Sequence, residues 1–286
     1  MFPSSTQLKF WTYSGTAELN RLRIEANQQF VQKYGREYNE VSRNEFFLNT
    51  AEETKIRRHY EYVLKEFCNG FQPTMPRYVL GTAMMYLKRF YLHNSVMNFH
   101  PEDIVYTCVY LACKVEEFNV SILQFVANVK SKREEMAEMI LSQELLLMHE
   151  LHYHLTVHGP LRPLEGLFID IKTRCPDVLE TEQLRRGAED FIDRSFHTDA
   201  CLIFAPSQIA LAALLSCSSK FGLNLDSYVA NKLVVSSDKE DMMKMVENIK
   251  RINLILKTTE TLDRGQVKEL LAEAGAMSQP GEQPQE

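Results

Sequence analysis

The sequence lacks the features that mark a secreted or membrane-spanning protein. No apolar run reaches the roughly 18 residues that a membrane span needs, and the N-terminus lacks the basic-then-apolar order of a secretion signal. The six cysteines are scattered, without a CxxC pair: Cys68, Cys108, Cys113, Cys175, Cys201 and Cys217. We therefore expect no membrane contact and reduced thiols packed as small hydrophobic side chains inside the cell.

Catalytic and metal-binding motifs are missing as well. The chain has no phosphate-binding glycine loop, no GxSxG and no kinase catalytic loop. The stretch "HELHYHLTVH" resembles a zinc-protease motif, but HExxH needs a histidine four positions after His149, where Tyr153 stands. The formal net charge of -6 argues against a nucleic-acid binder. The sequence predicts no enzyme, no cofactor and no metal site.

Helix signals dominate what remains. Glycine is sparse, with 11 in 286 residues, and no proline occurs between Pro101 and Pro160. Because few stretches alternate with period two, we predict an all-α protein. The predicted helices are 15–34, 53–69, 76–93, 101–117, 121–129, 133–151, 160–174, 182–197, 206–221, 226–233, 238–257 and 262–274. The predicted start signals are three capping boxes and three first-turn prolines: Thr50 with Glu53, Ser121 with Gln124, Ser237 with Glu240, and Pro76, Pro101 and Pro206.

Two apolar segments that begin with proline indicate an internal repeat. "PEDIVYTCVYLACKVEEFNV" begins at Pro101 and "PSQIALAALLSCSSKFGLNL" at Pro206, an offset of 206 − 101 = 105 residues. The same offset aligns Arg89 in "YLKRFY" with Arg194 in "FIDRSF". Since the order of helices also agrees, we predict two similar helical domains, each wrapped around its proline-started helix.

Two charges in the first half are not repeated in the second. At the same offset Lys114 falls on Ser219, and Glu144 falls on Ile249. Both charged residues lie in mostly apolar stretches, "LACKVEEF" and "ILSQELLLMHEL". A lysine at a helix C-terminus is often just a solvated complement to the helix dipole. If the two helices pack together, however, the pair meets at one end of the bundle, where it can hold another protein's backbone.

These residues carry a resemblance to a known family. "LKRFY", "LACKVEEF" and the later Glu144 resemble the cyclin box of the cyclin family, and the similarity extends from about residue 5 to residue 257. The resemblance implies an all-α fold of two tandem five-helix cyclin-box domains with extra N- and C-terminal helices. The expected division is 1–51 for an N-terminal helix and connector, 52–159 for the first cyclin box, 160–258 for the second, and 259–286 for a C-terminal helix and disordered tail.

The resemblance also implies a function. It is that of a regulatory subunit, without catalytic residues, that binds and activates a cyclin-dependent kinase in the CDK-activating kinase complex. That complex phosphorylates cell-cycle kinases and, within transcription factor IIH, the C-terminal repeats of RNA polymerase II. The implied partners are the kinase catalytic subunit, a RING-finger assembly subunit and the transcription factor IIH core, in the nucleus. The implied kinase-binding residues are Lys114, Val115, Glu144, Met148, Tyr153 and Leu155.

One departure and two alternatives accompany the resemblance. Mitotic and S-phase cyclins carry a substrate-docking motif in the first box helix, whereas this helix reads "KIRRHYEYVLKEF" and the only tryptophan is Trp11. We therefore do not expect substrate recruitment through that groove. One alternative is a cyclin C-type transcriptional cyclin, which shares "KRFY" and "KVEEF". The other is a cyclin-fold nucleic-acid binder like transcription factor IIB, against which the acidic balance argues.

Overall fold

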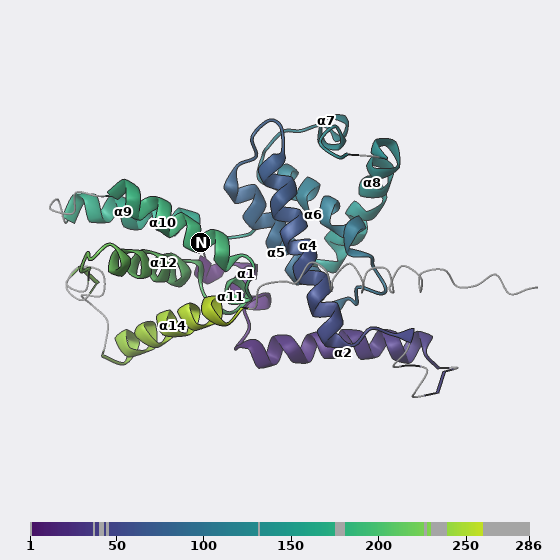
Figure 1. Cartoon of the computed structure of the whole chain (residues 1–286), viewed down its shortest axis with the longest axis horizontal. Coiled ribbons are helices and arrows are strands. Elements are labelled where there is room, and N and C mark those ends of the chain that lie inside the picture. Colours follow the sequence, from purple (N-terminus) through teal and green to yellow (C-terminus); the bar gives the residue numbers. More distant parts are fainter. Residues whose placement is uncertain are drawn as a thin grey trace, which may run out of the picture. The chain divides into compact units, whose positions relative to one another are not determined.

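The fold is helical throughout the part of the chain that the structure describes. The computed structural model describes residues 2–36, 38–39, 43, 46–130, 132–174, 181–225, 228–229 and 239–259. Every regular element in these ranges is a helix, which confirms the all-α prediction (Figure 1). The chain divides into two compact units, of which one holds Gly15–Leu155 and the other joins the residues up to Ser14 to Thr156–Glu260.

The first unit holds a long N-terminal helix and a five-helix bundle. Its helices are α2 (Thr16–Tyr34), α4 (Thr50–Gly70), α5 (Arg77–His93), α6 (Pro101–Val115), α7 (Ile122–Val126) and α8 (Arg133–Glu150). Helix α6 packs against α4, α5 and α8, and α2 lies along α5 and α4. Since α6 is apolar on nearly every side, burial within the bundle removes most of its surface from water, as the sequence predicts.

The start of α4 differs from the prediction. The N-cap is Asn49, whose side chain accepts hydrogen bonds from the Ala51 and Glu52 N–H groups, while Glu52 accepts from the Asn49 N–H. The predicted Thr50–Glu53 box is therefore wrong, because Asn49 one residue earlier is the better cap. Glu53 turns inward instead and accepts a hydrogen bond from the Ser95 hydroxyl.

Of the other predicted helix starts in this unit, two are confirmed and one is displaced by a residue. The predicted Ser121–Gln124 capping box is present at α7. Pro101 is the first residue of its helix, as predicted, whereas Pro76 is the N-cap of α5 and lies just outside it. The Ser237–Glu240 box lies partly outside the described residues.

The second unit repeats the arrangement around its own apolar helix. Its helices are α1 (Thr6–Phe10), α9 (Leu161–Arg174), α10 (Thr181–Ser195), α11 (Ala200–Ile203), α12 (Pro206–Lys220) and α14 (Lys239–Thr258). Helix α12 packs against α9, α10 and α14 (Figure 1), and Pro206 is its first residue, as predicted. The sequence prediction missed α1 and α11, and most of its helix 226–233 lies outside the described residues.

The N-terminal segment completes this second unit. The Gln7 side chain donates to the His158 carbonyl oxygen at 3.2 Å and accepts from the His158 N–H at 2.7 Å. Trp11 is buried, and the Tyr13 N–H donates to the Leu202 carbonyl oxygen at 2.8 Å. Hydrogen bonds and apolar burial therefore attach the segment before Ser14 to the rest of the second unit. The predicted domain division, with 1–51 as one segment, stays a prediction.

The remaining sequence predictions concern the cysteines, the C-terminal residues, membrane spans and metal sites. Cys68, Cys108, Cys113, Cys201 and Cys217 are buried thiols, whereas Cys175 lies outside the described residues. The predicted helix 262–274 and the tail also lie outside them. Within the described ranges, no helix is both long enough and apolar enough for a membrane crossing. The same ranges contain no group of three or more side chains able to hold a metal ion.

Candidate functional site

The two unrepeated charges meet. The Lys114 Nζ, on the last turn of α6, lies 2.7 Å from Oε1 and 2.8 Å from Oε2 of Glu144 on α8. The packing of α6 against α8 brings the two side chains together across 30 positions of sequence. The lysine side chain is 46% exposed and the glutamate side chain 15%, so the pair lies at the rim of the bundle. Part of the lysine side chain is therefore accessible from solvent.

The neighbours of Lys114 hold its helix end in place. The Lys114 Nζ lies 4.7 Å from the centre of the Tyr110 ring, a cation–π distance that favours one lysine orientation. Glu116 is not part of the exposed pair, because its carboxylate accepts a hydrogen bond from the Thr82 hydroxyl of α5 at 2.6 Å. Glu116 therefore links the end of α6 to α5.

The ends of α6 and α8 share an unusual backbone geometry. Glu117, just after α6, and His152 and Tyr153, just after α8, all have positive φ angles, of 58°, 52° and 57°. The Phe118 N–H donates to the Cys113 carbonyl oxygen and the Tyr153 N–H to that of Met148, which closes each helix with a left-handed turn. Left-handed backbone costs a non-glycine residue roughly 1–2 kcal/mol. The two turns fix the backbone directly after α6 and α8, the helices that carry Lys114 and Glu144.

Buried polar side chains of α5 donate hydrogen bonds to the backbone of the segment that follows α8. Arg89 of α5 is fully buried and donates from Nη1 to the His154 carbonyl oxygen at 3.0 Å. The Tyr86 hydroxyl donates to the Leu155 carbonyl oxygen. Burial raises the pKa of the Tyr86 hydroxyl, so this donor stays protonated over the ordinary pH range. The arrangement makes 153–155 a rigid edge.

The other predicted site residues border this rim. Val115 and Met148 are half-buried, at the end of α6 and in the last turns of α8. Tyr153 is 58% exposed, and Leu155 is half-buried. The structure therefore places two of the six residues at the end of α6, two in the second half of α8 and two in the segment that follows α8. Their role in binding stays a prediction.

Sequence reasoning missed two exposed leucines on α8. Leu141 is 50% exposed and Leu145 is 63% exposed, one turn apart and next to Glu144 on the helix. Buried Ile140 and Leu147 occupy the opposite face. Because the helix is apolar on both faces, its pattern did not distinguish an inner from an outer side. Apolar residues on both faces of α8 were the sequence feature from which a second, exposed apolar face could have been predicted.

The surface combines an ammonium, a carboxylate and exposed apolar side chains. Lysine donates to carbonyl groups at a partner's helix end, and glutamate accepts from N–H groups. Exposed leucine and tyrosine side chains supply apolar area for a stable contact. The groups that this surface offers are hydrogen-bond donors, acceptors and apolar area.

Comparisons with known proteins agree with this organisation. The model of the cyclin N-terminal domain matches residues 30–156, and the model of the cyclin C-terminal domain matches residues 159–257. The chain is 46% identical over 263 residues to Cyclin-H of Xenopus laevis, covering 91% of this chain and 81% of that protein. It is 33% identical over 180 residues to Cyclin-C of Drosophila melanogaster, covering 58% of this chain and 64% of that protein.

Solved structures show the same fold. One chain of the CAK complex from Chaetomium thermophilum bound to ATP-gamma-S superposes with a TM-score of 0.81 at 22% identity, covering 98% of this chain and 89% of that one. The family models account for most of the residues between 30 and 257, and the similarity to Cyclin-H extends over nearly the whole chain. The chain belongs to the cyclin family.

Proposed function

We propose that this chain is the regulatory cyclin subunit of a CDK-activating kinase, which binds a cyclin-dependent kinase and activates it. The observation that carries the proposal is the near-full-length similarity to Cyclin-H, which exceeds the similarity to Cyclin-C in both identity and extent. The cyclin C-type alternative is therefore not favoured. The chain itself is regulatory and not catalytic.

The mechanism follows from what a protein kinase needs in order to be active. A glutamate on its mobile αC helix must pair with the lysine of strand β3, and its activation loop must be ordered. A rigid partner that binds only this arrangement shifts the population toward it, without contributing a catalytic group. A shift from 1:99 to 99:1 requires about 5.5 kcal/mol of differential binding. The cyclin supplies this difference in affinity.

We assign the binding surface to the rim formed by Lys114, Val115, Glu144, Met148, Tyr153 and Leu155. The Lys114 side chain is half-exposed, so its ammonium is able to donate to backbone carbonyls of the kinase near αC while it keeps Glu144 oriented. The apolar members of the set supply buried area around the charges. We add Leu141 and Leu145 to this surface, because both are exposed beside Glu144.

The finer assembly is also part of the proposal. The structural neighbour from Chaetomium thermophilum belongs to a CAK complex, and another neighbour belongs to the yeast TFIIK complex of Kin28, Ccl1 and Tfb3. By analogy we propose a RING-finger assembly subunit and the transcription factor IIH core as further partners. The substrates would be cell-cycle kinases and the C-terminal repeats of RNA polymerase II, in the nucleus.

Reconstitution with the kinase tests the function. The full chain is mixed with the purified catalytic subunit of a CDK-activating kinase, and phosphorylation of an activation-loop substrate is measured with and without the chain. We expect a stable complex and a large increase in activity. A folded chain that neither binds this kinase nor raises its activity would overturn the proposal.

A further inference from the structure

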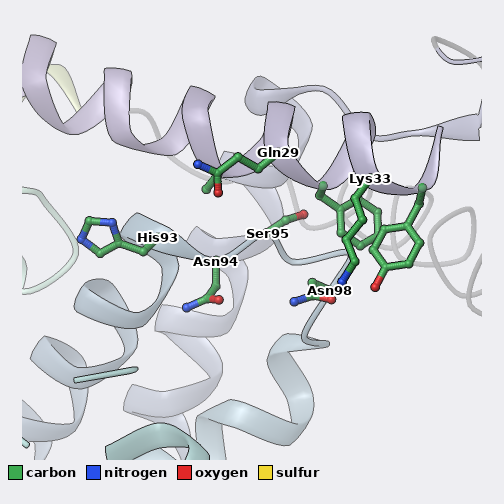
Figure 2. Close-up of a pocket in the computed structure, with 9 residues that line it drawn as sticks. Gln29, Lys33, His93, Asn94, Ser95 and Asn98 are labelled. Carbon is green, nitrogen blue, oxygen red and sulfur yellow. The ribbon is translucent and has the colours of Figure 1, made fainter. Parts of the chain in front are cut away.

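A pocket in the first unit lies outside the proposed kinase-binding surface. It has a volume of about 170 Å³ and opens between α2 and the turn that follows α5 (Figure 2). Nine residues line it: Ala26, Gln29, Phe30, Lys33, Tyr34, His93, Asn94, Ser95 and Asn98. None of them belongs to the set proposed to bind the kinase. Small-molecule sites usually enclose about 300–1,000 Å³, so this pocket suits one or two amino-acid side chains better than a cofactor.

The floor of the pocket is fixed before any ligand arrives. The Asn94 side chain donates to the Phe90 carbonyl oxygen and to Glu150 Oε2, each at 3.0 Å. The Ser95 hydroxyl donates to the buried Glu53, and the Asn98 N–H donates to the Ser95 carbonyl oxygen at 3.1 Å. A site whose walls are already ordered loses little conformational entropy on binding.

One end of the pocket is built for an anion. Among the described residues that line the pocket, Lys33 is the only formally charged one, and none is a carboxylate. Figure 2 shows the Lys33 ammonium directed toward Asn98, with Gln29 extending from α2 toward the same cavity. Within the described part of the chain, neither Gln29 nor Asn98 makes a side-chain hydrogen bond. Lys33 and Asn98 line the same pocket, and an ammonium and an amide NH₂ are both donors that a carboxylate accepts from.

The other end has a different character. Glu150 accepts from Asn94 and from His149, and its charge acts on His93. Burial lowers the pKa of the His93 imidazole, so this side chain is neutral at pH 7. An anion near His93 would be repelled by the charges of Glu150 and Glu25, both of which act on this imidazole. The carboxylate of a ligand is therefore directed to the Lys33 end.

Aromatic rings lie beside the charged end. The rings of Phe30 and Tyr34, both in the pocket lining, have centroids 4.7 Å apart, and the Lys33 Nζ lies 4.9 Å from the centre of the Tyr34 ring. The stack continues from Phe30 to Phe47 at 6.2 Å. Since Tyr34 is 49% exposed, these rings present a platform for an apolar side chain next to the anion-binding end.

We propose that this pocket docks an acidic peptide segment of a partner protein. Lys33 and Asn98 hold a glutamate or aspartate carboxylate, and the Gln29 amide pairs with the peptide main chain. The residue next to the acid packs on Phe30 and Tyr34. The proposal concerns α2 and the turn after α5 only, and it does not rest on the proposed kinase binding.

Selection from a displayed library of short random peptides tests this docking. The full chain is the bait, and clones that bind the bare support are removed by counter-selection. We expect enriched peptides with an acidic residue next to an apolar or aromatic one. The selection overturns the proposal if it enriches no peptides, or peptides without a shared acidic position.

Binding of the best peptide, synthesised with a fluorescent label, supplies the second arm. Lys33→Glu should weaken binding about tenfold or more, the size expected for the loss of a charge-assisted hydrogen bond. Asn98→Ala should also weaken it. Lys130→Glu, the same charge change at another exposed lysine of this unit, should leave it unchanged.

Charge reversal in the peptide separates a direct contact from a structural effect. Replacing the acid of the peptide by lysine should abolish binding to the wild-type chain and restore part of it with Lys33→Glu. Equal binding by wild-type and Lys33→Glu, or equal loss in Lys130→Glu, would overturn the assignment. Circular dichroism on each variant verifies that the helices are intact.

Discussion

Exchange of the charges of Lys114 and Glu144 separates their role inside the bundle from their role in binding. Lys114→Glu alone replaces an attraction at 2.7 Å by repulsion and removes the ammonium from the Tyr110 ring. A half-exposed pair contributes roughly 0–1 kcal/mol and an exposed cation–π contact about 0.5–1 kcal/mol. We therefore expect the single variant to lose about 1–2 kcal/mol of unfolding free energy and to remain folded. The double variant Lys114→Glu/Glu144→Lys should recover the ionic part.

Kinase binding should respond differently. If Lys114 donates to kinase carbonyls and Glu144 accepts from kinase N–H groups, the exchanged pair presents each group in the wrong place. Loss of a desolvated interfacial charge costs about 2–5 kcal/mol, or more than tenfold in affinity. We expect both the single and the double variant to fail to activate the kinase, although the double variant regains stability.

Urea unfolding and a reconstituted kinase assay measure the two effects. The matched control is the exchange of Glu240 and Lys244 on α14, an exposed pair at the same 2.7 Å. Because Glu240 lies in the first turn of its helix, this exchange should cost about 0.3–1 kcal/mol of stability but should leave activation unchanged. If the double variant activates the kinase as well as the wild-type chain does, the pair acts only inside the bundle. If Lys114→Glu alone activates normally, the assignment of this surface is wrong.

Three further predictions concern neighbouring features. Glu117→Gly should raise the unfolding free energy by about 1 kcal/mol, because glycine tolerates the φ of 58° that strains glutamate, as measured by urea unfolding. Leu145→Ser should leave stability within about 0.5 kcal/mol, because the side chain is exposed, but should weaken kinase binding in a titration. Burial raises the pKa of the Glu53 carboxyl above 4.5, so its contribution to stability is complete below that value and is lost as pH rises through the folded pKa. Glu53→Gln should therefore flatten the pH dependence of the unfolding free energy in that window.

Each of these has an outcome that contradicts it. A lower urea midpoint for Glu117→Gly would mean that the glutamate side chain stabilises the turn by more than the backbone strain. Normal kinase affinity with Leu145→Ser would remove that leucine from the binding surface, with exposed Leu123→Ser on α7 as a control for non-specific effects. An unchanged pH profile for Glu53→Gln would show that the carboxyl titrates alike in the folded and unfolded chain.

The local features of the sequence predicted much of the helical architecture. Period, caps and prolines located α2 and α5 to α9 within a few residues, because side-chain spacing and backbone capping act over one or two turns. The error at Asn49 is of the same kind, since two overlapping capping patterns compete there and the better cap prevails. Short helices α1 and α11 were missed because a turn or so of helix carries too little periodic signal.

The sequence by itself determined that the chain is helical, that its two halves are similar, and that Lys114 and Glu144 are charges for which the repeat gives no reason. Only the tertiary structure decided which faces are covered. It left Leu141 and Leu145 exposed, paired Glu116 with Thr82, and brought Lys33 and Asn98 into the lining of one pocket. The physical reason is that exposure and contact depend on packing between residues far apart in sequence, whereas periodicity reports only that a side is apolar, not what covers it.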